Sequence, residues 1–257
     1  MLNKVYQKVQ PLLIALQFLS SLPVGHLPLP KDKDIGASLN YYPLVGLILA
    51  LLLSVLAYAL MSVFGSVLSA AILLAFWVYL TGALHLDGLA DCADAWMGGL
   101  GSKDRTLLLM KDPTSGPFAI VVLLLVLLIK FAAIEALLAQ GQHWFFMWAL
   151  VFARLSAMIL FATTPYVRKS GLGKAISQYL NVNTVAAISL ITALISFIFL
   201  TWKIIPVLVI AGLGLLYLRH LMLQRIDGCT GDTAGALIEI NEMLILITLV
   251  AMLGLPL

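Results

Sequence analysis

Three aspartates in one short segment have the spacing of a metal-binding helix face. Asp87, Asp91 and Asp94 follow one another at intervals of four and three residues, so on a helix they would share an arc of roughly 60°. Like charges this close destabilise a bare helix unless a cation compensates them. Oxygen ligands suit Mg²⁺, which typically takes one or two carboxylates and completes its shell with water and substrate phosphates. The segment therefore predicts a magnesium site for phosphate chemistry, in preference to a solvated acidic loop.

A second group of acids opens the last apolar stretch of the chain. Asp232 is followed by Glu239 and Glu242 at offsets of seven and ten residues. A carboxylate within a membrane costs on the order of 3 kcal/mol, so both glutamates should face a wet cavity or a partner. Two interpretations follow. These acids complete one or two metal sites with the first group, or the glutamates pair with Arg154 or Lys130 inside the bundle.

Basic residues gather in the loops expected near these acids. Lys103, Arg105 and Lys111 follow the first acidic segment, and Arg168 lies in a later loop that also contains glycine. Arginine and lysine accumulate in cytoplasmic loops for reasons of topology alone. The planar guanidinium of arginine also suits phosphate binding, and we interpret the set as phosphate ligands.

Two further polar residues have two interpretations each. Arg154 falls inside an apolar window, where it would either pair with a glutamate or hold a phosphate. His85 is either an interfacial histidine that is hydrogen-bonded to backbone or a substrate ligand.

The whole chain has the composition of a membrane protein. It is 62% hydrophobic and 11% charged, with a mean hydropathy of +1.07, whereas soluble domains are about one-quarter charged. About twenty apolar residues cross a hydrocarbon core of roughly 30 Å. Seven such windows are predicted, near residues 38–62, 66–84, 117–139, 144–164, 184–200, 204–221 and 235–255. We predict an all-α polytopic membrane bundle, a single catalytic domain over residues 1–257, with Pro11–Leu22 as a short interfacial or re-entrant segment.

The charges between the windows predict the orientation. With the N-terminus on one side, that side carries twelve lysines and arginines and the other carries only Lys203. The positive-inside rule makes the richer side cytoplasmic. Loops 85–116, 165–183 and 222–234 then converge on the cytoplasmic face of the cell membrane, with the C-terminus on the opposite side.

Four motifs together resemble the cobalamin synthase family, also called adenosylcobinamide-GDP ribazoletransferases. The resemblance covers essentially the whole chain, in order. Its motifs are Thr81–Asp94 with the core His-Leu-Asp-Gly-Leu-Ala-Asp, Asp104–Asp112, Tyr166–Gly173, and Thr230–Ala236 with the core Thr-Gly-Asp. The chain departs from the family pattern at Asp227, where a second glycine is expected before Gly228.

The resemblance implies a magnesium-dependent transferase. It would join adenosylcobinamide-GDP to α-ribazole or α-ribazole 5′-phosphate, giving adenosylcobalamin or its 5′-phosphate and GMP. The implied partners are these two small molecules and the lipid bilayer, with no nucleic acid and with a homo-oligomer left open. Phosphoryl-type transfer of this kind depends mainly on positioning and charge neutralisation.

The resemblance also implies roles for the residues. Asp87, Asp91 and Asp94 would bind Mg²⁺ and the pyrophosphate, with Asp91 or Asp94 receiving the hydroxyl proton, and Asp232 and Glu239 would complete the metal shell. The implied substrate-binding residues are His85, Arg105, Lys111, Arg154, Arg168 and Thr230.

Two other functions are weighed against this one. A membrane CDP-alcohol phosphotransferase has similar aspartate spacing, but here Ala90 precedes Asp91 where that pattern has arginine. A cation transporter would distribute its carboxylates through the depth of the membrane, whereas these acids cluster towards one face. We therefore favour the ribazoletransferase.

Overall fold

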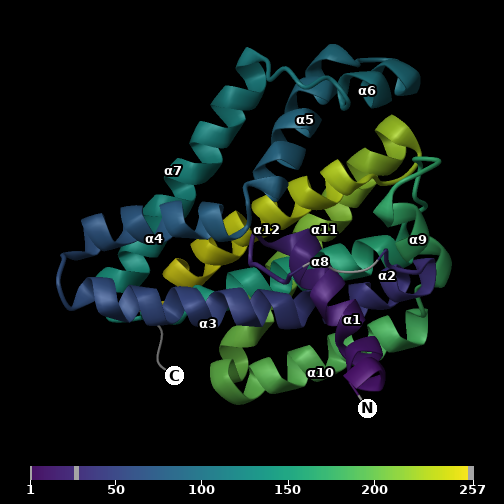
Figure 1. Cartoon of the computed structure of the whole chain (residues 1–257). Coiled ribbons are helices and arrows are strands. Elements are labelled where there is room, and N and C mark those ends of the chain that lie inside the picture. Colours follow the sequence, from purple (N-terminus) through teal and green to yellow (C-terminus); the bar gives the residue numbers. More distant parts are fainter. Residues whose placement is uncertain (1, 26–28, 254–257) are drawn as a thin grey trace.

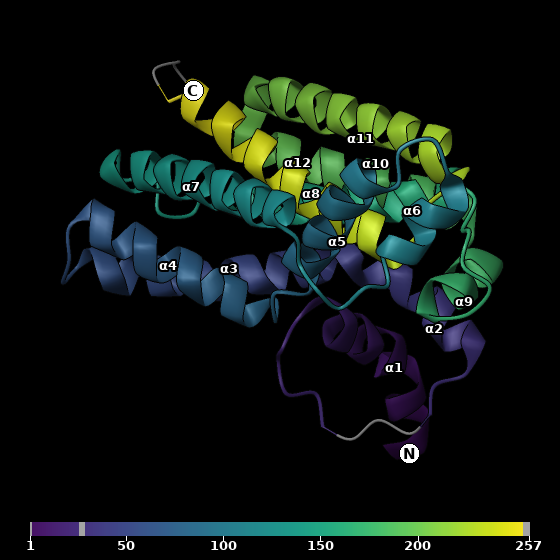
Figure 2. The ribbon, with the colours of Figure 1, turned by 90° about the horizontal axis from the view of Figure 1, so that it is seen from above.

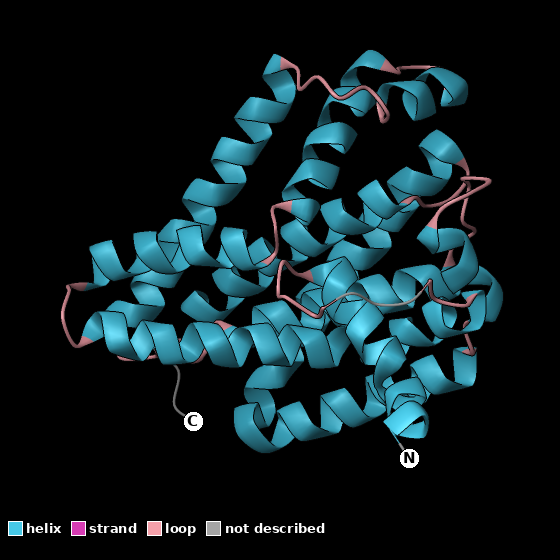
Figure 3. Cartoon of the chain, in the orientation of Figure 1, coloured by secondary structure: helices cyan, strands magenta, loops and turns pink. Residues whose placement is uncertain are grey.

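Helices account for nearly all of the described chain. The computed structural model describes residues 2–25 and 29–253, which contain no strand beyond an isolated bridge between Tyr166 and Cys229 (Figure 3). The prediction of an all-α membrane bundle is confirmed. In chain order the elements are α1 (Leu2–Leu19), α2 (Asp32–Ser38), η1 (Leu39–Tyr41), α3 (Tyr42–Met61), α4 (Ser66–Leu80), α5 (Leu84–Gly98), α6 (Lys103–Leu109), α7 (Pro117–Ala139), α8 (Met147–Thr163), α9 (Leu172–Tyr179), α10 (Val182–Leu200), η2 (Thr201–Lys203), α11 (Ile204–Ile226) and α12 (Gly231–Ala251).

The number of membrane-crossing helices differs from the seven apolar windows. Four helical stretches among the described residues are long and apolar enough to cross, namely 32–61, 117–139, 182–226 and 231–251, and a bent pair formed by α4 and α5 raises the number to five. Alone, α4 and α8 have only 15 and 17 residues, fewer than the roughly 20 that a span needs. The stretch 182–226 contains two predicted windows, α10 and α11, joined by η2. The last two residues of the window 235–255 lie outside the described residues.

The N-terminal segment is a helix that lies at the side of the bundle. The predicted interfacial segment Pro11–Leu22 corresponds to the second half of α1, which includes Pro11 and is too short to cross a membrane. Figure 2 shows α1 beside the main layer of helices. In its second half Ile14, Ala15 and Leu19 are buried.

A sharp bend between α4 and α5 sends the first acidic segment away from the bundle. The two helices meet at 86°, and in Figure 1 α5 rises away from α4 towards α6. Gly82 and Ala83 both have left-handed backbones, with φ of 61° and 54°. Glycine adopts that conformation without steric cost. The bend therefore places α5 against α12 instead of continuing α4.

The core is built around α8 and α12. Almost every residue of α8 is buried, and 61% of the apolar window of α12 is covered by other helices. Gly46 of α3 lets that helix approach α8 closely, because a Cβ there would lie 2.7 Å from the Leu150 carbonyl oxygen. This central pair holds the helices that carry the acidic residues.

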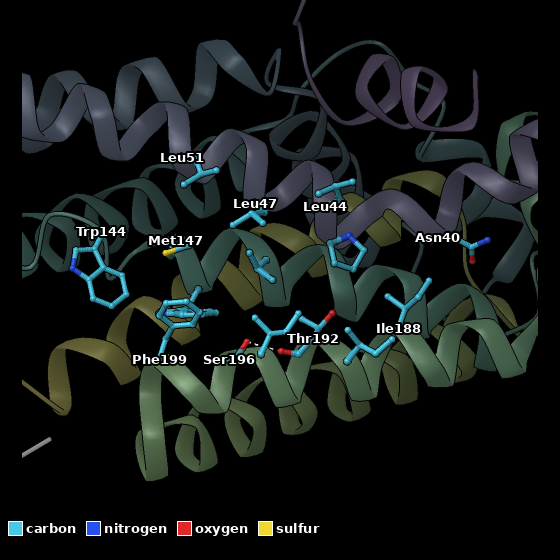
Figure 4. Close-up of a pocket in the computed structure, with 15 residues that line it drawn as sticks. Asn40, Leu44, Leu47, Leu51, Trp144, Met147, Ile188, Thr192, Ser196 and Phe199 are labelled. Carbon is cyan, nitrogen blue, oxygen red and sulfur yellow. Dashed lines mark hydrogen bonds between the residues drawn. The ribbon is translucent and has the colours of Figure 1, made fainter. Parts of the chain in front are cut away.

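A cavity of about 790 Å³ lies between α3, α8 and α10 (Figure 4). Its lining is almost entirely apolar, with side chains such as Leu47, Met147 and Phe199. None of the residues predicted to act in catalysis lines it, so we place the chemistry elsewhere.

Candidate active site

The acidic segments of α5 and α12 meet through two glycines. A Cβ on Gly88 would lie 2.7 Å from the carbonyl oxygen of Asp232, and one on Gly235 would lie 3.2 Å from the Cα of His85. Only glycine permits backbones to approach this closely. The start of α12 is therefore held against the middle of α5, so the two predicted acidic groups share one location.

Three carboxylates gather at this junction. Asp87 is exposed, whereas Asp91 and Asp232 are partly buried. The Asp91 carboxylate is repelled by Asp87, Asp232 and Asp94 and attracted by Arg168. This site concentrates negative charge, as the spacing of the aspartates predicts, and it suits a cation.

Asp94 uses its carboxylate to hold the start of α7. Its Oδ2 accepts a hydrogen bond from the Gly116 backbone N–H, and its Oδ1 accepts one from the Ala119 N–H at 3.0 Å. The first N–H groups of a helix have no partners within the helix, and an anion there also favours the helix dipole. Asp94 thus has a structural role in this arrangement, and its predicted role in catalysis stays a prediction.

Arg168 brings the second basic loop to the carboxylates. Its Nη2 lies 2.5 Å from Asp232 Oδ2 and 3.4 Å from the Met110 carbonyl oxygen. The loop itself is fixed to the start of α12, because the Val167 N–H donates to the Cys229 carbonyl and the Cys229 N–H donates to that of Pro165. Of the predicted phosphate ligands, Arg168 is the one seen in contact with an acidic site residue.

A tyrosine packs the same loop onto its neighbours. A Cβ on Gly173 would lie 2.3 Å from the Tyr166 ring, so glycine is required there. Burial raises the pKa of the Tyr166 hydroxyl above its ordinary value. The hydroxyl therefore stays protonated and remains able to donate a hydrogen bond.

The Thr-Gly-Asp segment caps α12. Thr230 is fully buried, and its hydroxyl accepts from the Thr233 N–H at 3.2 Å while the Thr233 hydroxyl accepts from the Thr230 N–H at 2.9 Å. This reciprocal capping box satisfies two helix-end donors. The substrate contact predicted for Thr230 stays a prediction, and its cap places Asp232 in the first turn.

The unusual Asp227 occupies a position that suits glycine. Its φ is +59°, a left-handed conformation that glycine and, less often, aspartate adopt. Its carboxylate lies 2.7 Å from Lys103 Nζ on the surface, where such pairs contribute little. The next position requires glycine, because a Cβ on Gly228 would lie 2.1 Å from the Pro165 oxygen. Asp227 thus adopts the left-handed backbone that a glycine at this position would adopt most readily.

The two glutamates of α12 belong to a buried network of charges. Lys130 Nζ lies 2.8 Å from Glu239 Oε2 and 2.5 Å from Glu242 Oε2, and Arg154 Nη1 donates to Glu242. Lys130 also lies over the Trp77 ring, 4.7 Å from its centroid. All four charged groups are buried, and their charges balance. The ion-pair interpretation of Glu239, Glu242 and Arg154 is therefore the arrangement seen.

A pocket of about 340 Å³ opens beside the carboxylates. Helices α1, α3, α5, α8 and α12 all contribute residues to it. His85 and Asp87 line it from α5, and Asp232 lines it from α12. His85 is 4% exposed, and the charged groups that act on it are Arg154 and Lys130.

The remaining predicted phosphate ligands lie on and after α6. Arg105 and Lys111 are exposed to solvent. The loop after Lys111 is held where the Thr114 hydroxyl and N–H donate to Asp112, which lowers the pKa of that carboxyl below its ordinary value. Substrate contacts of Arg105 and Lys111 stay predictions.

Residues 11–250 match the family model described as cobalamin-5-phosphate synthase. The chain belongs to this family. A protein named adenosylcobinamide-GDP ribazoletransferase from Pseudomonas fluorescens (strain Pf0-1) is 47% identical over 239 residues, which cover 93% of this chain and 98% of that protein. Proteins of the same name from Pseudomonas putida (strain GB-1) and Pseudomonas entomophila (strain L48) are 48% and 47% identical, over 93% and 94% of this chain and 98% and 99% of their own lengths. No solved structure gives a significant match.

Membership of the cobalamin-5-phosphate synthase family confirms the resemblance seen in the motifs. The names of the relatives also confirm that the chain is an enzyme of the transferase type. The four motifs of the family lie where the structure forms its site. Thr81–Asp94 forms the α4–α5 bend and α5, and Thr230–Ala236 forms the cap of α12.

The donor set of this site fits Mg²⁺. Among residues 2–25 and 29–253, no three acidic, histidine or cysteine side chains lie close enough to hold a metal by themselves. Mg²⁺ does not require three, because it usually binds one or two carboxylates and keeps several waters. Asp87, Asp91 and Asp232 offer only oxygen ligands at a place where negative charge is uncompensated apart from Arg168.

Some residues of the site were missed in the sequence. Tyr42 lines the 340 Å³ pocket, but an aromatic residue at the start of an apolar helix gives no signal that separates it from an ordinary interfacial tyrosine. Lys130 was not missed, because its pairing with the glutamates of the last helix is one of the two interpretations drawn from the sequence and is the arrangement seen.

Proposed function

We propose that this chain joins adenosylcobinamide-GDP to α-ribazole or α-ribazole 5′-phosphate and releases GMP. The observation that carries the proposal is the gathering of Asp87, Asp91, Asp232 and Arg168 at one junction in a chain 46–48% identical to proteins named for this transfer. The site offers what a pyrophosphate requires, namely a cation-binding acidic cluster and a guanidinium.

The proposed reaction replaces a phosphoanhydride bond with a phosphate ester bond. A ribose hydroxyl oxygen of the acceptor bonds to the phosphorus of the cobinamide phosphate, the bond from that phosphorus to GMP breaks, and GMP leaves with the bonding electrons. The hydroxyl proton passes to a carboxylate. Asp91 is better placed for this than Asp94, because both oxygens of Asp94 already accept hydrogen bonds from α7.

The remaining site residues position the phosphates. Asp87, Asp91 and Asp232 would hold Mg²⁺, which supplies neutralisation of pyrophosphate charge when it is bound. Arg168 would bind the same phosphates through its guanidinium, which already lies beside Asp232 at the site. Arg105 and Lys111 would approach from the solvent side.

We also propose that the N-terminus and the loops of the site face the cytoplasm. The excess of lysine and arginine on that side of the predicted spans supports this orientation. A cytoplasmic site would have direct access to water-soluble nucleotide substrates.

A reconstituted assay tests the proposal. Purified protein in liposomes is given adenosylcobinamide-GDP and α-ribazole, and GMP and the corrinoid product are measured with Mg²⁺ and with EDTA. We expect product only with Mg²⁺. In Asp91→Asn we expect turnover to fall at least 100-fold, the lower range for loss of a general base.

A matched control substitution removes one carboxylate outside the site, so that loss of a site residue can be told apart from loss of negative charge in general. Asp32→Asn removes an exposed aspartate of α2 and should leave turnover unchanged. A folded wild-type protein that forms no product, or product that persists in EDTA and in Asp91→Asn, would overturn the proposal.

A further inference from the structure

The pocket beside the carboxylates contains buried polar atoms that have no partner. Tyr42 is 1% exposed and His85 is 4% exposed. The Tyr42 hydroxyl and both ring nitrogens of His85 make no hydrogen bond within the described residues, and both side chains line the pocket. Buried polar groups are normally satisfied. A ligand in the cavity that carries complementary polar atoms would satisfy both groups once the two side chains turn towards it.

The opposite wall of the pocket is aromatic. Phe18 of α1 and Phe161 of α8 line it together with Tyr42, and the Phe18 and Tyr42 rings lie 6.4 Å apart at 31°. Aromatic walls favour a flat ring, which gains stacking beyond its buried area. Asp87 and Asp232 also line the pocket. One cavity therefore combines aromatic, neutral polar and acidic side chains.

The size of the pocket separates the two substrates. Its volume of about 340 Å³ is at the small end of the roughly 300–1,000 Å³ typical of pockets for small molecules. A nucleoside with one fused aromatic ring system is of this size. A corrinoid linked to a nucleotide is several times larger and cannot enter.

We propose that this pocket binds the acceptor, a small aromatic ribonucleoside. The base lies among Phe18, Tyr42 and Phe161, polar atoms of the nucleoside bond to the Tyr42 hydroxyl and to His85, and the ribose faces the carboxylates. This inference rests on the proposed transferase function and assigns one substrate to one cavity. The donor then approaches from the solvent side, where Arg105 and Lys111 are exposed.

Tyr42→Phe and His85→Gln test this assignment. Each removes or alters one polar group and keeps the volume of the side chain. With protein in nanodiscs, we expect the KM for α-ribazole to rise roughly fivefold to tenfold in each variant, as for the loss of one hydrogen bond. The KM for adenosylcobinamide-GDP should stay within twofold of wild type. Equilibrium dialysis of α-ribazole without donor should show the same loss of affinity.

Two further variants make the result decisive. Tyr58→Phe alters an exposed tyrosine on the same helix, 73% accessible, and should change neither KM. Gln17→Trp places a bulky ring at the exposed rim of the pocket and should weaken α-ribazole binding without any change in the buried core.

The outcomes distinguish this inference from the proposed function. If wild type turns over and Tyr42→Phe, His85→Gln and Gln17→Trp all keep the α-ribazole KM, or if the donor KM rises instead, the pocket assignment is wrong and the transferase stands. If wild type forms no product and binds no α-ribazole, both are wrong.

Discussion

Individual residues of the buried charge network have a stability role that can be separated from metal binding. Lys130 is 1% exposed and contacts both glutamates of α12. Removing one partner of a buried ion pair leaves an uncompensated charge and typically costs about 3–5 kcal/mol. We expect Lys130→Met to lower the free energy of unfolding by about that amount, as measured by titration with SDS in mixed micelles.

The double variant supplies the control for this prediction. Lys130→Met combined with Glu239→Gln removes one positive and one negative charge, so part of the lost stability should return. Glu239→Gln alone should leave the Mg²⁺ concentration for half-maximal turnover unchanged, because its carboxylate faces Lys130. A large rise in that concentration would instead establish Glu239 as a metal ligand, as the family resemblance implies.

At this scale the sequence identified the acids and, as one of two interpretations, the basic partners of the two glutamates, but not the partners of Asp94. The spacing of Asp87, Asp91 and Asp94 placed three carboxylates on one helix. It could not show that Asp94 accepts hydrogen bonds from Gly116, 22 residues later, because a cap across a loop depends on where the next helix begins. Tyr42 was missed for a similar reason, since its unsatisfied hydroxyl is visible only in the folded pocket.

At the scale of elements, the close contact between α5 and α12 leads to a prediction. A Cβ on Gly88 would meet Asp232 backbone atoms at 2.7, 3.0 and 3.2 Å, and backbone cannot move aside as a side chain can. Gly88→Ala should therefore push the helices apart and separate Asp91 from Asp232. We expect kcat/KM to fall at least tenfold, together with a measurable loss of thermal stability.

A second glycine provides the comparison. Gly212 lies in α11, and a Cβ there would meet nothing within 4 Å. Gly212→Ala should keep full activity and, because alanine has the better helix propensity, should be neutral or stabilising by up to about 1 kcal/mol. Equal activity in both alanine variants would contradict the argument that close packing of α5 on α12 assembles the site.

Helices were predicted best where the length of an apolar run determines their boundaries. The window 117–139 coincides with α7, because a long apolar run has no alternative to a helix in lipid. The window 66–84 overran α4, which ends at Leu80, and the 86° bend was not foreseen. That bend depends on left-handed backbones at Gly82 and Ala83, and a single glycine in an apolar run does not reveal it.

For the whole molecule, the directions of the helices explain how distant segments converge. Figure 1 shows the α3–α4 turn and the end of α12 at one end of the bundle, with α2, α5, α6 and α9 towards the other. Charge alone predicted that three loops converge, namely 85–116, 165–183 and 222–234. They supply Asp87, Arg168 and Thr230 to one neighbourhood. The excess of lysine and arginine predicts which side of the membrane these loops face. An experiment can test that prediction.

Single introduced cysteines can report which side of the membrane each end of the bundle faces. Cys92 and Cys229 are buried free thiols and should react slowly with a membrane-impermeant maleimide. Ser62 lies in the α3–α4 turn and Ser170 in the loop before α9, and both are exposed. We expect S62C to be labelled in intact spheroplasts and S170C only after lysis, because the basic loops should be cytoplasmic. Gln140→Cys, in the exposed turn after α7, should behave as S62C does. Labelling of S170C from outside would reverse the orientation and place the site on the other face of the membrane.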